Sequence, residues 1–419
     1  MQPKIYTLEE HRISPDRVDQ HALYVIEKLK QAGHKAYLVG GGVRDLLLNQ
    51  RPKDFDISTS AEPEEIRALF RNALLIGRRF RLAHIRFGKK IIEVATFRAG
   101  DPESADLIVR DNVWGTEEED VLRRDFTING LFYDPEDQTV IDYVDGFPDL
   151  EKRILRTIGQ PQMRFVQDPV RMIRLLKFCA RFDFEIERPT HEALLFCKDQ
   201  IVKSSPVRIL EELLRMLESG ASESFFRLLY QYGLLKMLIS PLAHFIQLDK
   251  DQRIFKILAE VDSEMKKAYP NTPDRSLPLS AICFPILDLT VHHHIRTTGK
   301  PPHLGEIASE ASDLITNLFS PFFRIPRRLK GMMIFALATQ YRLTPIDGRP
   351  VRRPRLPQDE SVPVSMHLFK IRCALQPDLL PLYTTWTEAL FESQQGEPPL
   401  TEEPRRSRPR RRRRKRAEP

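Results

Sequence analysis

The sequence predicts an α+β head, followed by helical domains and a disordered basic tail. Three observations support this fold class. Strand-like and helix-like patterns alternate over the first 148 residues, whereas beyond about Glu151 the apolar residues recur mostly at helical spacing. The segment from Arg405 to Arg416 contains ten Lys or Arg and no acidic residue. A segment of that composition cannot bury enough apolar surface to fold.

A glycine-rich turn between a strand and a helix opens the head. Ala36–Val39 is predicted to be a buried strand and Val43–Asn49 the first turns of a helix. The glycines between them are Gly40, Gly41 and Gly42. Such a turn lets backbone N–H groups face a phosphate, and Arg44 would add a planar fork for phosphate oxygens. The alternative is an ordinary tight turn, and the spacings of a Walker loop and of a dinucleotide-binding turn are both missing.

Two carboxylates follow about a dozen residues later. Asp54 and Asp56 would share one face of a strand, while Phe55 and Ile57 would point into a core. Such a pair suits two Mg²⁺ ions that clamp the attacking and leaving oxygens of a phosphoryl transfer. Taken alone, such a pair is more often two solvated turn carboxylates. With the upstream glycines, the pattern favours nucleotidyl transfer.

A third carboxylate lies in Ile91–Phe97, which otherwise reads as a buried strand. An isolated charge there is costly unless it is paired or bound to a cation. Glu93 is therefore the candidate third metal ligand, although pairing with a nearby arginine explains it equally well. The preceding run Leu82–Phe87 alternates and is predicted to be a strand. We expect His84 within it to be packed or hydrogen-bonded rather than to act as a general base.

The segment around residue 125 offers polar groups for a nucleotide. Asp125 could accept hydrogen bonds from ribose hydroxyls, and Arg123 and Arg124 could contact phosphates. The acidic run Glu117–Asp120 could instead form salt bridges with the two arginines.

A second polar pair lies further along the chain. Asp168 and Arg171 are three residues apart, hence on one helical face. Because Asp168 directly precedes Pro169, helix N-capping alone could also explain its presence.

The order and spacing of these segments resemble the bacterial poly(A) polymerases, which belong with the CCA-adding enzymes to the class II nucleotidyltransferases. The resemblance covers about the first half of the chain. Its shared segments are Leu38–Asp45, Asp54–Asp56, Glu93–Arg98, Arg123–Asn129 and Asp168–Arg174. It implies a polymerase-β-like head with a small mixed sheet, helical neck and body domains, and RNA binding by the body.

The resemblance also implies a role for each site residue. Asp54, Asp56 and Glu93 would hold the catalytic Mg²⁺, and the glycine turn with Arg44 would receive the triphosphate. The residues near the ribose and phosphates would be Arg124, Asp125 and Asn129, and those facing the base would be Asp168 and Arg171. Gln167 stands where the family usually has Glu. This departure bears on base readout or on the orientation of Arg171.

One sequence segment distinguishes poly(A) polymerases from CCA-adding enzymes within the superfamily. Gly77–Ile85 resembles the form found in poly(A) polymerases rather than in CCA-adding enzymes. The expected reaction is attack of an RNA 3′ hydroxyl on the α-phosphate of ATP, with Mg²⁺ bridging and pyrophosphate leaving. CCA addition to tRNA is the alternative enzyme. An RNA-binding protein without catalytic activity is the alternative class, and the intact set of carboxylates gives it no support. The sequence names no protein partner.

Length and composition indicate several domains. With 419 residues, 41% of them hydrophobic, the chain can build two or three cores. We expect a head at 1–148, a neck at 149–217, a body at 218–395 and the tail at 396–419, with Asp145–Pro148 at the first boundary. The expected helical segments are Val170–Arg181, His191–Lys198, Ile209–Leu217, Ser224–Leu235 and Val364–Glu392, the last preceded by a linker at Pro345–Pro363.

Other features favour a cytoplasmic location. No apolar stretch approaches the about 20 residues that span a bilayer, and no signal peptide is indicated. The cysteines have no metal-ligand or paired spacing and are expected to be reduced core residues: Cys179, Cys197, Cys283 and Cys373. His292–His294 is expected to lie in a surface loop rather than to bind a metal.

The basic excess of the chain lies in its tail. Of 65 Lys or Arg, 55 lie outside Arg405–Arg416, against 58 Asp or Glu in the chain. The tail would therefore bind RNA by counterion release, in a salt-dependent manner. A nuclear localisation signal and a solubility tail are the competing interpretations, and the bacterial resemblance favours RNA.

Overall fold

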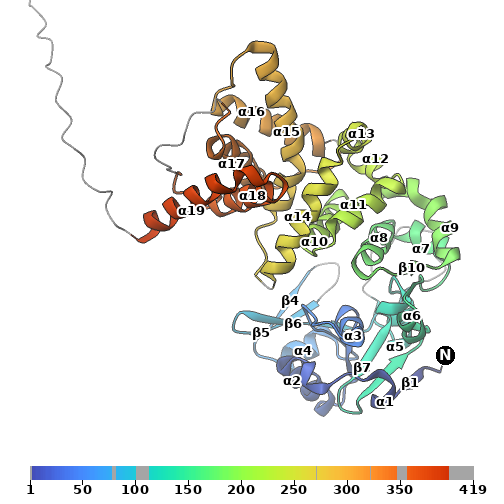
Figure 1. The fold of residues 1–419 in the computed structure, drawn as a ribbon. Helices are drawn as coiled ribbons and strands as arrows, with labels where there is room; N and C mark the ends of the chain where they lie inside the picture. Colours follow the sequence, from blue (N-terminus) through green and yellow to red (C-terminus); the bar gives the residue numbers. More distant parts are fainter. Residues whose placement is uncertain are drawn as a thin grey trace, which may run out of the picture.

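The computed structural model describes residues 2–77, 82–100, 113–269, 271–320, 322–346 and 356–395. The predicted basic tail lies outside these residues. So do residues 78–81 of Gly77–Ile85, the segment that resembles poly(A) polymerases rather than CCA-adding enzymes. Figure 1 shows a sheet-containing head at one end of the molecule, from which helices extend to the other end. Among the described helices, none combines the length and the apolar character that a membrane crossing requires.

The head is built on a mixed sheet of eight strands. In spatial order they are β1 (Lys4–Tyr6), β8 (Thr139–Asp142), β7 (Leu131–Asp134), β2 (Ala36–Val39), β3 (Asp56–Thr59), β6 (Lys90–Thr96), β5 (Leu82–Phe87) and β4 (Ala73–Ile76). Only β3 and β6 pair in parallel among them. The predicted mixed sheet is confirmed, and β2 and β5 have the bounds expected from their apolar patterns.

Short helices cover the sheet. They are α1 (Leu8–His11), α2 (Gln20–Gln31), α3 (Gly41–Leu47), α4 (Pro63–Leu69), α5 (Glu117–Leu122) and α6 (Gly146–Glu151), with single 3₁₀ turns at Pro15–Arg17 and Thr127–Asn129. One face packs against α2 and α4, where Leu38, Ile57 and Val94 join Val25 and Ile66 in a core. The opposite face is partly covered by α5, and its remaining surface faces the rest of the chain.

The remainder of the described chain is mostly helical, as predicted. Its helices are α7 (Pro161–Gln167), α8 (Val170–Phe182), α9 (Arg188–Cys197), α10 (Pro206–Leu217), α11 (Ser222–Gln231), α12 (Leu234–Leu238), α13 (Ser240–Leu248), α14 (Arg253–Ala268), α15 (Ser276–Thr298), α16 (Leu304–Phe319), α17 (Arg327–Leu343), α18 (Val362–Leu375) and α19 (Leu380–Gln395), with 3₁₀ turns at Lys198–Lys203 and Pro377–Leu379.

Three expectations for this part are corrected. A small parallel pair of strands, β9 (Ile154–Leu155) and β10 (Glu185–Ile186), interrupts the helices. The single helix expected around residue 230 is divided into α11 and α12 at Gly233, whose φ of 78° suits glycine. His292–His294 lies on the exposed surface of α15 rather than in a loop.

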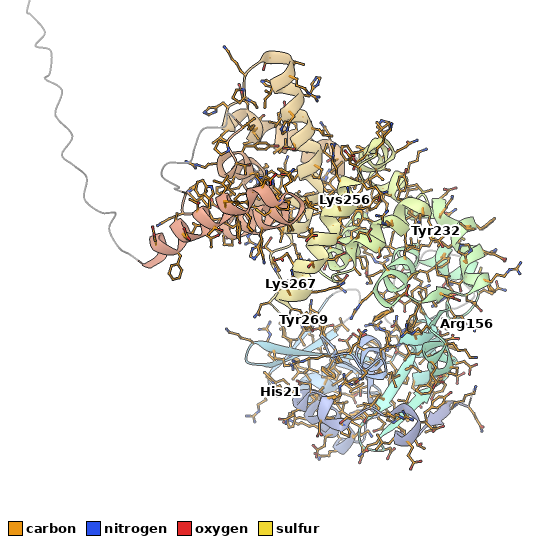
Figure 2. All side chains as sticks on the ribbon, in the orientation of Figure 1. His21, Arg156, Tyr232, Lys256, Lys267 and Tyr269 are labelled. Atoms are coloured by element: carbon orange, nitrogen blue, oxygen red, sulfur yellow. The ribbon has the colours of Figure 1, made fainter. Side chains whose placement is uncertain are left out.

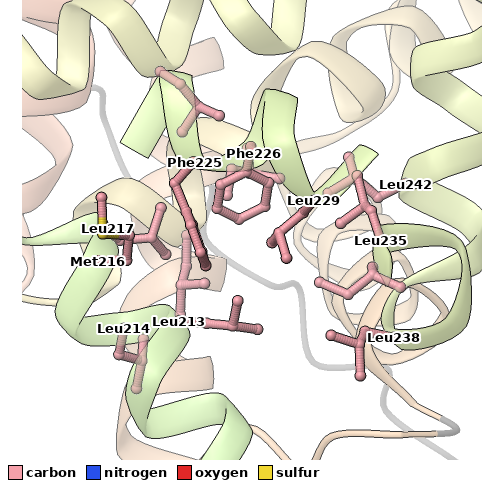
Figure 3. Packing of buried hydrophobic residues seen from close by; sticks show 14 of the residues in the cluster. Leu213, Leu214, Met216, Leu217, Phe225, Phe226, Leu229, Leu235, Leu238 and Leu242 are labelled. Atoms are coloured by element: carbon pink, nitrogen blue, oxygen red, sulfur yellow. The ribbon is translucent and has the colours of Figure 1, made fainter. Parts of the chain in front are cut away.

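One large core runs from the neck into the body. Apolar side chains of α10, α11, α12 and α13 interdigitate within it (Figure 3), including Leu213, Phe225 and Leu235. A smaller, separate core joins α18 to α19 around Phe369 and Trp386. All four cysteines are free, and three of them are buried. The domain boundaries given above stay predictions, because the continuous packing marks no sharp division between neck and body.

Candidate active site

A cleft of about 2100 Å³ lies between the head and the helices that follow it. Among the described residues, its lining contains sixteen Lys or Arg and ten Asp or Glu. This surplus of positive charge contrasts with the near balance of the chain outside its tail. Because walls of one charge sign concentrate the opposite charge, the cleft favours a polyanionic ligand.

A row of side chains crosses the sheet on the face that lines the cleft. Val39 pairs with Asp56, Asp56 with Glu93, and Glu93 with His84. Directly opposed residues in a sheet project to the same face, so Asp56 and Glu93 are neighbours. Asp54 lies just before β3 and is exposed, so it is not part of the strand as expected.

Glu93 is not buried, so the free-energy cost of burying its charge that we expected does not arise. Its side chain is 48% exposed, because β6 alternates between buried and exposed residues instead of being buried throughout. The Glu93 carboxylate lies 3.4 Å from the ring of His84. Among the described residues, the partner of Glu93 is this histidine rather than the predicted arginine.

The carboxylates repel one another. Burial, and then the charges of Glu93 and Asp54, raise the pKa of Asp56 to about 6, against the opposing effect of Arg124 and Arg215. A bound cation would remove that repulsion. Oxygen ligands of this kind are those that Mg²⁺ prefers. In the described residues, no three His, Cys, Asp or Glu side chains are already arranged to hold one metal ion.

The glycine turn brings the backbone close to this row. Gly40 has a φ of 65°, and a Cβ on it would come within 3.3 Å of Arg124 Nη1. A Cβ on Gly42 would lie 3.3 Å from the carbonyl oxygen of Asp54. Helix α3 begins at Gly41, two residues before the predicted start. The close approach of α3 to the residue before β3 explains why small residues stand here.

Arg44 is held inside the protein. It is 4% exposed and donates a hydrogen bond to Asn129 Oδ1 at 2.6 Å and another to Asp45 Oδ1 at 2.7 Å. Its guanidinium also lies against the rings of Phe178 and Phe182, at 4.9 and 4.7 Å from their centroids. These contacts fix α3 to α8, and the predicted contact of Arg44 with a triphosphate stays a prediction.

The two arginines near residue 125 form the salt bridges that the sequence left open. Asp120 accepts a hydrogen bond from Arg123 Nε at 3.0 Å and from Arg124 Nη2 at 2.8 Å. Burial acts to raise the pKa of Asp120, but Arg124 and Arg123 hold it below its ordinary value. Arg124 also donates to Ser58 Oγ at 3.2 Å. Both arginines nevertheless line the cleft.

A buried ionic network joins the head to the neck. Asp125 accepts hydrogen bonds from Asn129 Nδ2 at 3.0 Å and from Arg174 Nε at 2.7 Å. Arg174 reaches Glu212 at 3.3 Å, and Lys177 donates to the same carboxylate. Burial acts to raise the pKa of Asp125, yet Arg174 and Asn129 hold it below its ordinary value. Burial and Arg174 lower the pKa of Lys177 to about 8.

Asp168 is paired rather than a helix cap. It accepts two hydrogen bonds from Arg208, at 2.9 and 2.7 Å. Helix α8 begins at Val170 after Pro169 and has no side-chain capping bond, so the capping interpretation is wrong. Asp168 and Arg208 both line the cleft.

Gln167 acts on the cleft through Arg164. Its Oε1 accepts a hydrogen bond from Arg164 Nη1 at 2.9 Å, and the described cleft lining does not include it. Arg164 donates to the carbonyls of Arg123 and Arg124 at 2.7 and 2.6 Å, and Arg171 donates to the carbonyl of Arg164 at 3.0 Å. Burial, and then the charge of Arg171, lower the pKa of Arg164 to about 10.

The structure therefore brings every predicted site residue to one cleft. The predicted residues that line it are Gly40, Gly41, Gly42, Arg44, Asp54, Asp56, Glu93, Arg124, Asp125, Asn129, Asp168 and Arg171. Sequence reasoning missed Arg174, Lys177 and Arg181, which line it from α8. Their spacing of three and four residues, continuing from Arg171, is the helical signal that could have identified them.

Comparison with known proteins agrees with this arrangement. A family model described as the poly A polymerase head domain matches residues 36–156. A second model, described as the probable RNA and SrmB-binding site of polymerase A, matches residues 183–246. Poly(A) polymerase I of Salmonella typhi is 42% identical over 264 residues, which are 60% of this chain and 57% of that protein. The chain thus spans little more than half the length of this curated relative.

CCA-adding enzymes are also similar. That of Lactobacillus johnsonii is 36% identical over 215 residues, or 51% of this chain and 54% of that protein. The fold resembles the Bacillus stearothermophilus CCA-adding enzyme in complex with CTP, with a TM-score of 0.63, 23% identity, and coverage of 89% of this chain and 82% of that one. Both kinds of relative are nucleotidyltransferases. The chain is thus similar in sequence to bacterial poly(A) polymerases and CCA-adding enzymes over 51–60% of its length, in the region where its motifs lie.

Proposed function

We propose that the protein is a template-independent polynucleotide adenylyltransferase, which transfers AMP from ATP to RNA 3′ ends and releases pyrophosphate. The observation that carries this proposal is the row of Asp56 and Glu93, with Asp54 beside it, in a cleft lined mainly by basic side chains. The 42% identity to a poly(A) polymerase over 264 residues supports the choice of ATP. We also propose a cytoplasmic location, where ATP and RNA are both available.

Asp54, Asp56 and Glu93 would hold Mg²⁺ in this proposal. When bound, Mg²⁺ lowers the pKa of a hydroxyl and offsets negative charge on phosphate oxygens. The carboxylate donor set and the raised pKa of Asp56 fit such a cation, since burial and the charges of Glu93 and Asp54 outweigh the effect of Arg124 and Arg215 on Asp56.

The other residues of the cleft would position the two substrates. The glycine turn, Arg44 and Arg124 would approach the triphosphate, and Asp125 and Asn129 would lie near the ribose. Asp168 and Arg171 would face the base. Their common place in the cleft lining supports these roles. The existing hydrogen bonds of Asp125 and Arg171 to other parts of the protein suit groups that hold a fixed geometry for a ligand.

The basic tail, residues 405–416, would add a second contact with RNA in this proposal. Its ten Lys or Arg would release counterions from RNA phosphates and so strengthen binding at low salt.

CCA addition is the second candidate function. The observation that favours it is the 36% identity to a CCA-adding enzyme. The replacement of Glu by Gln167 leaves both activities open, because Gln167 contacts Arg164 rather than the cleft.

One gel separates the two candidates. Each nucleoside triphosphate is supplied alone, with Mg²⁺, to an oligoadenylate primer and to a tRNA without its terminal CCA. We expect many adenylates on the oligoadenylate and poor use of CTP. If the tRNA gains two cytidines and one adenosine and then stops, while the oligoadenylate is ignored, the protein is a CCA-adding enzyme.

A further inference from the structure

The end of α14 that faces the head forms part of the cleft wall. Lys266, in the last turn of α14, and Tyr269, directly after it, both line the cleft. Figure 2 shows Tyr269 at the end of α14 that faces the sheet. The RNA-binding family model ends at residue 246, so this wall lies beyond the region it describes.

Tyr269 presents an aromatic ring to the cleft. It is 49% exposed, so a face of the ring is accessible from the cleft. Among the described residues, no aromatic ring stacks on it. Exposed aromatic rings in a basic groove are the usual platforms for unstacked nucleic-acid bases, because every base offers a flat face.

Lys266 supplies a positive charge beside this ring. In the described part of the chain it forms no ion pair, whereas the adjacent Lys267 lies 3.4 Å from Glu264 and outside the cleft lining. The stem of Lys266 crosses Gly220, where an added Cβ would lie 2.8 Å from Lys266 Cγ. Lys266 is exposed and lines the cleft, so its charge can act on a ligand there.

Hydrogen bonds within the protein hold the end of α14 in place without a ligand. Asp262, one turn before Lys266, accepts hydrogen bonds from the Ser222 backbone N–H at 2.7 Å and from the Glu223 N–H at 2.9 Å. The Ser222 hydroxyl donates to the same carboxylate at 2.7 Å. These bonds join α14 to the first turn of α11. A surface that is already ordered loses less entropy when it binds.

We propose that Tyr269 and Lys266 bind the last nucleotides of the RNA substrate, with Tyr269 stacking on a base and Lys266 contacting a phosphate. The inference rests on the proposed function, since it places the RNA in the cleft that contains the carboxylates. Single-stranded RNA is the occupant because stacking on Tyr269 needs a base that is free of a duplex. The positive charge of the cleft lining complements its backbone.

The test measures RNA binding without nucleotide. A fluorescent oligoadenylate is titrated with the full-length protein at several salt concentrations, and primer KM and ATP KM are then measured separately. Tyr269→Ala is expected to raise both the Kd for RNA and the primer KM about tenfold, with little change in ATP KM. Tyr269→Phe, which keeps the ring, is expected to bind normally. Lys266→Ala is expected to reduce the salt slope of log Kd by about 0.7, and the matched control Lys267→Ala to leave it unchanged.

Several results would overturn the inference. These are an unchanged Kd for Tyr269→Ala, an effect on ATP KM with an unchanged RNA Kd, or no RNA binding by the unaltered protein. If the unaltered protein adds adenylates and Tyr269→Ala matches it in primer KM, only the inference fails. If RNA binding depends on Tyr269 but no nucleotide is incorporated, the proposed function fails and this RNA site stands.

Discussion

Two carboxylates that line the same cleft have opposite surroundings. Asp56 lies beside Glu93 and Asp54, and burial together with these like charges raises its pKa to about 6. Asp125 is bonded to Arg174, which with its other hydrogen-bond donors holds its pKa below the ordinary value against the effect of burial. The protein neutralises Asp125 by itself, whereas Asp56 needs positive charge from outside. The comparison separates a carboxylate whose geometry the protein already fixes, Asp125, from one that a bound cation would stabilise, Asp56.

The largest expected effect on stability comes from the Asp125 side. Asp125→Ala removes one of the two carboxylate partners of the partly buried Arg174 and a hydrogen-bond acceptor of Asn129, so we expect a loss of about 3 kcal/mol in the free energy of unfolding. Asp54→Ala is the matched control, because Asp54 is exposed and its loss removes repulsion. Urea unfolding of both variants measures the difference. Similar losses of stability in the two variants would show that Asp125 contributes no more to the fold than the exposed Asp54 does.

The Asp56 side is expected to respond to pH when metal is removed. Its raised pKa means that the folded protein binds more protons than the unfolded chain between about pH 4 and pH 6. Stability in a chelator should therefore fall as pH rises through this window, by at most about 3 kcal/mol. The comparison of unaltered protein with Asp56→Asn isolates this contribution. If the stability of Asp56→Asn decreases by the same amount over this pH range, other titratable groups cause the decrease.

The smallest expected effect concerns Gln167. Gln167→Glu would place a carboxylate against Arg164, whose pKa burial lowers to about 10. We expect a gain of about 1 kcal/mol in stability, since a charged acceptor strengthens the hydrogen bond. Base preference should not change, because Gln167 lies behind the described cleft lining. A switch from ATP to CTP use would place Gln167 in base readout after all.

Local patterns were sufficient for the elements that hold the site. The apolar run of β2 and the alternation of β5 determined their bounds, because strand periodicity depends only on neighbouring residues. Even Glu93 was located correctly on its strand, although its exposure was misjudged. The alternation of burial along β6 was obscured by its many apolar residues.

Contacts between distant residues could not be predicted. Arg208 pairs with Asp168 from 40 residues away, and Arg44 is covered by Phe178 and Phe182 from another helix. Tyr269 joins the cleft because the end of α14 that carries it faces the head. Such contacts depend on how helices pack, which spacing along the chain does not specify.

The central claim is that Asp54, Asp56 and Glu93 form a cation-dependent centre for adenylate transfer. Its most direct test is incorporation of labelled AMP into an oligoadenylate primer over a Mg²⁺ titration. Asp54→Ala, Asp56→Ala and Glu93→Ala are expected to lose more than about 100-fold in rate at every Mg²⁺ concentration, because the transition state loses several kcal/mol of charge stabilisation. Circular dichroism and urea midpoints close to those of the unaltered protein would show that the fold is intact. Incorporation at the unaltered rate by either aspartate variant at saturating Mg²⁺ would contradict the claim.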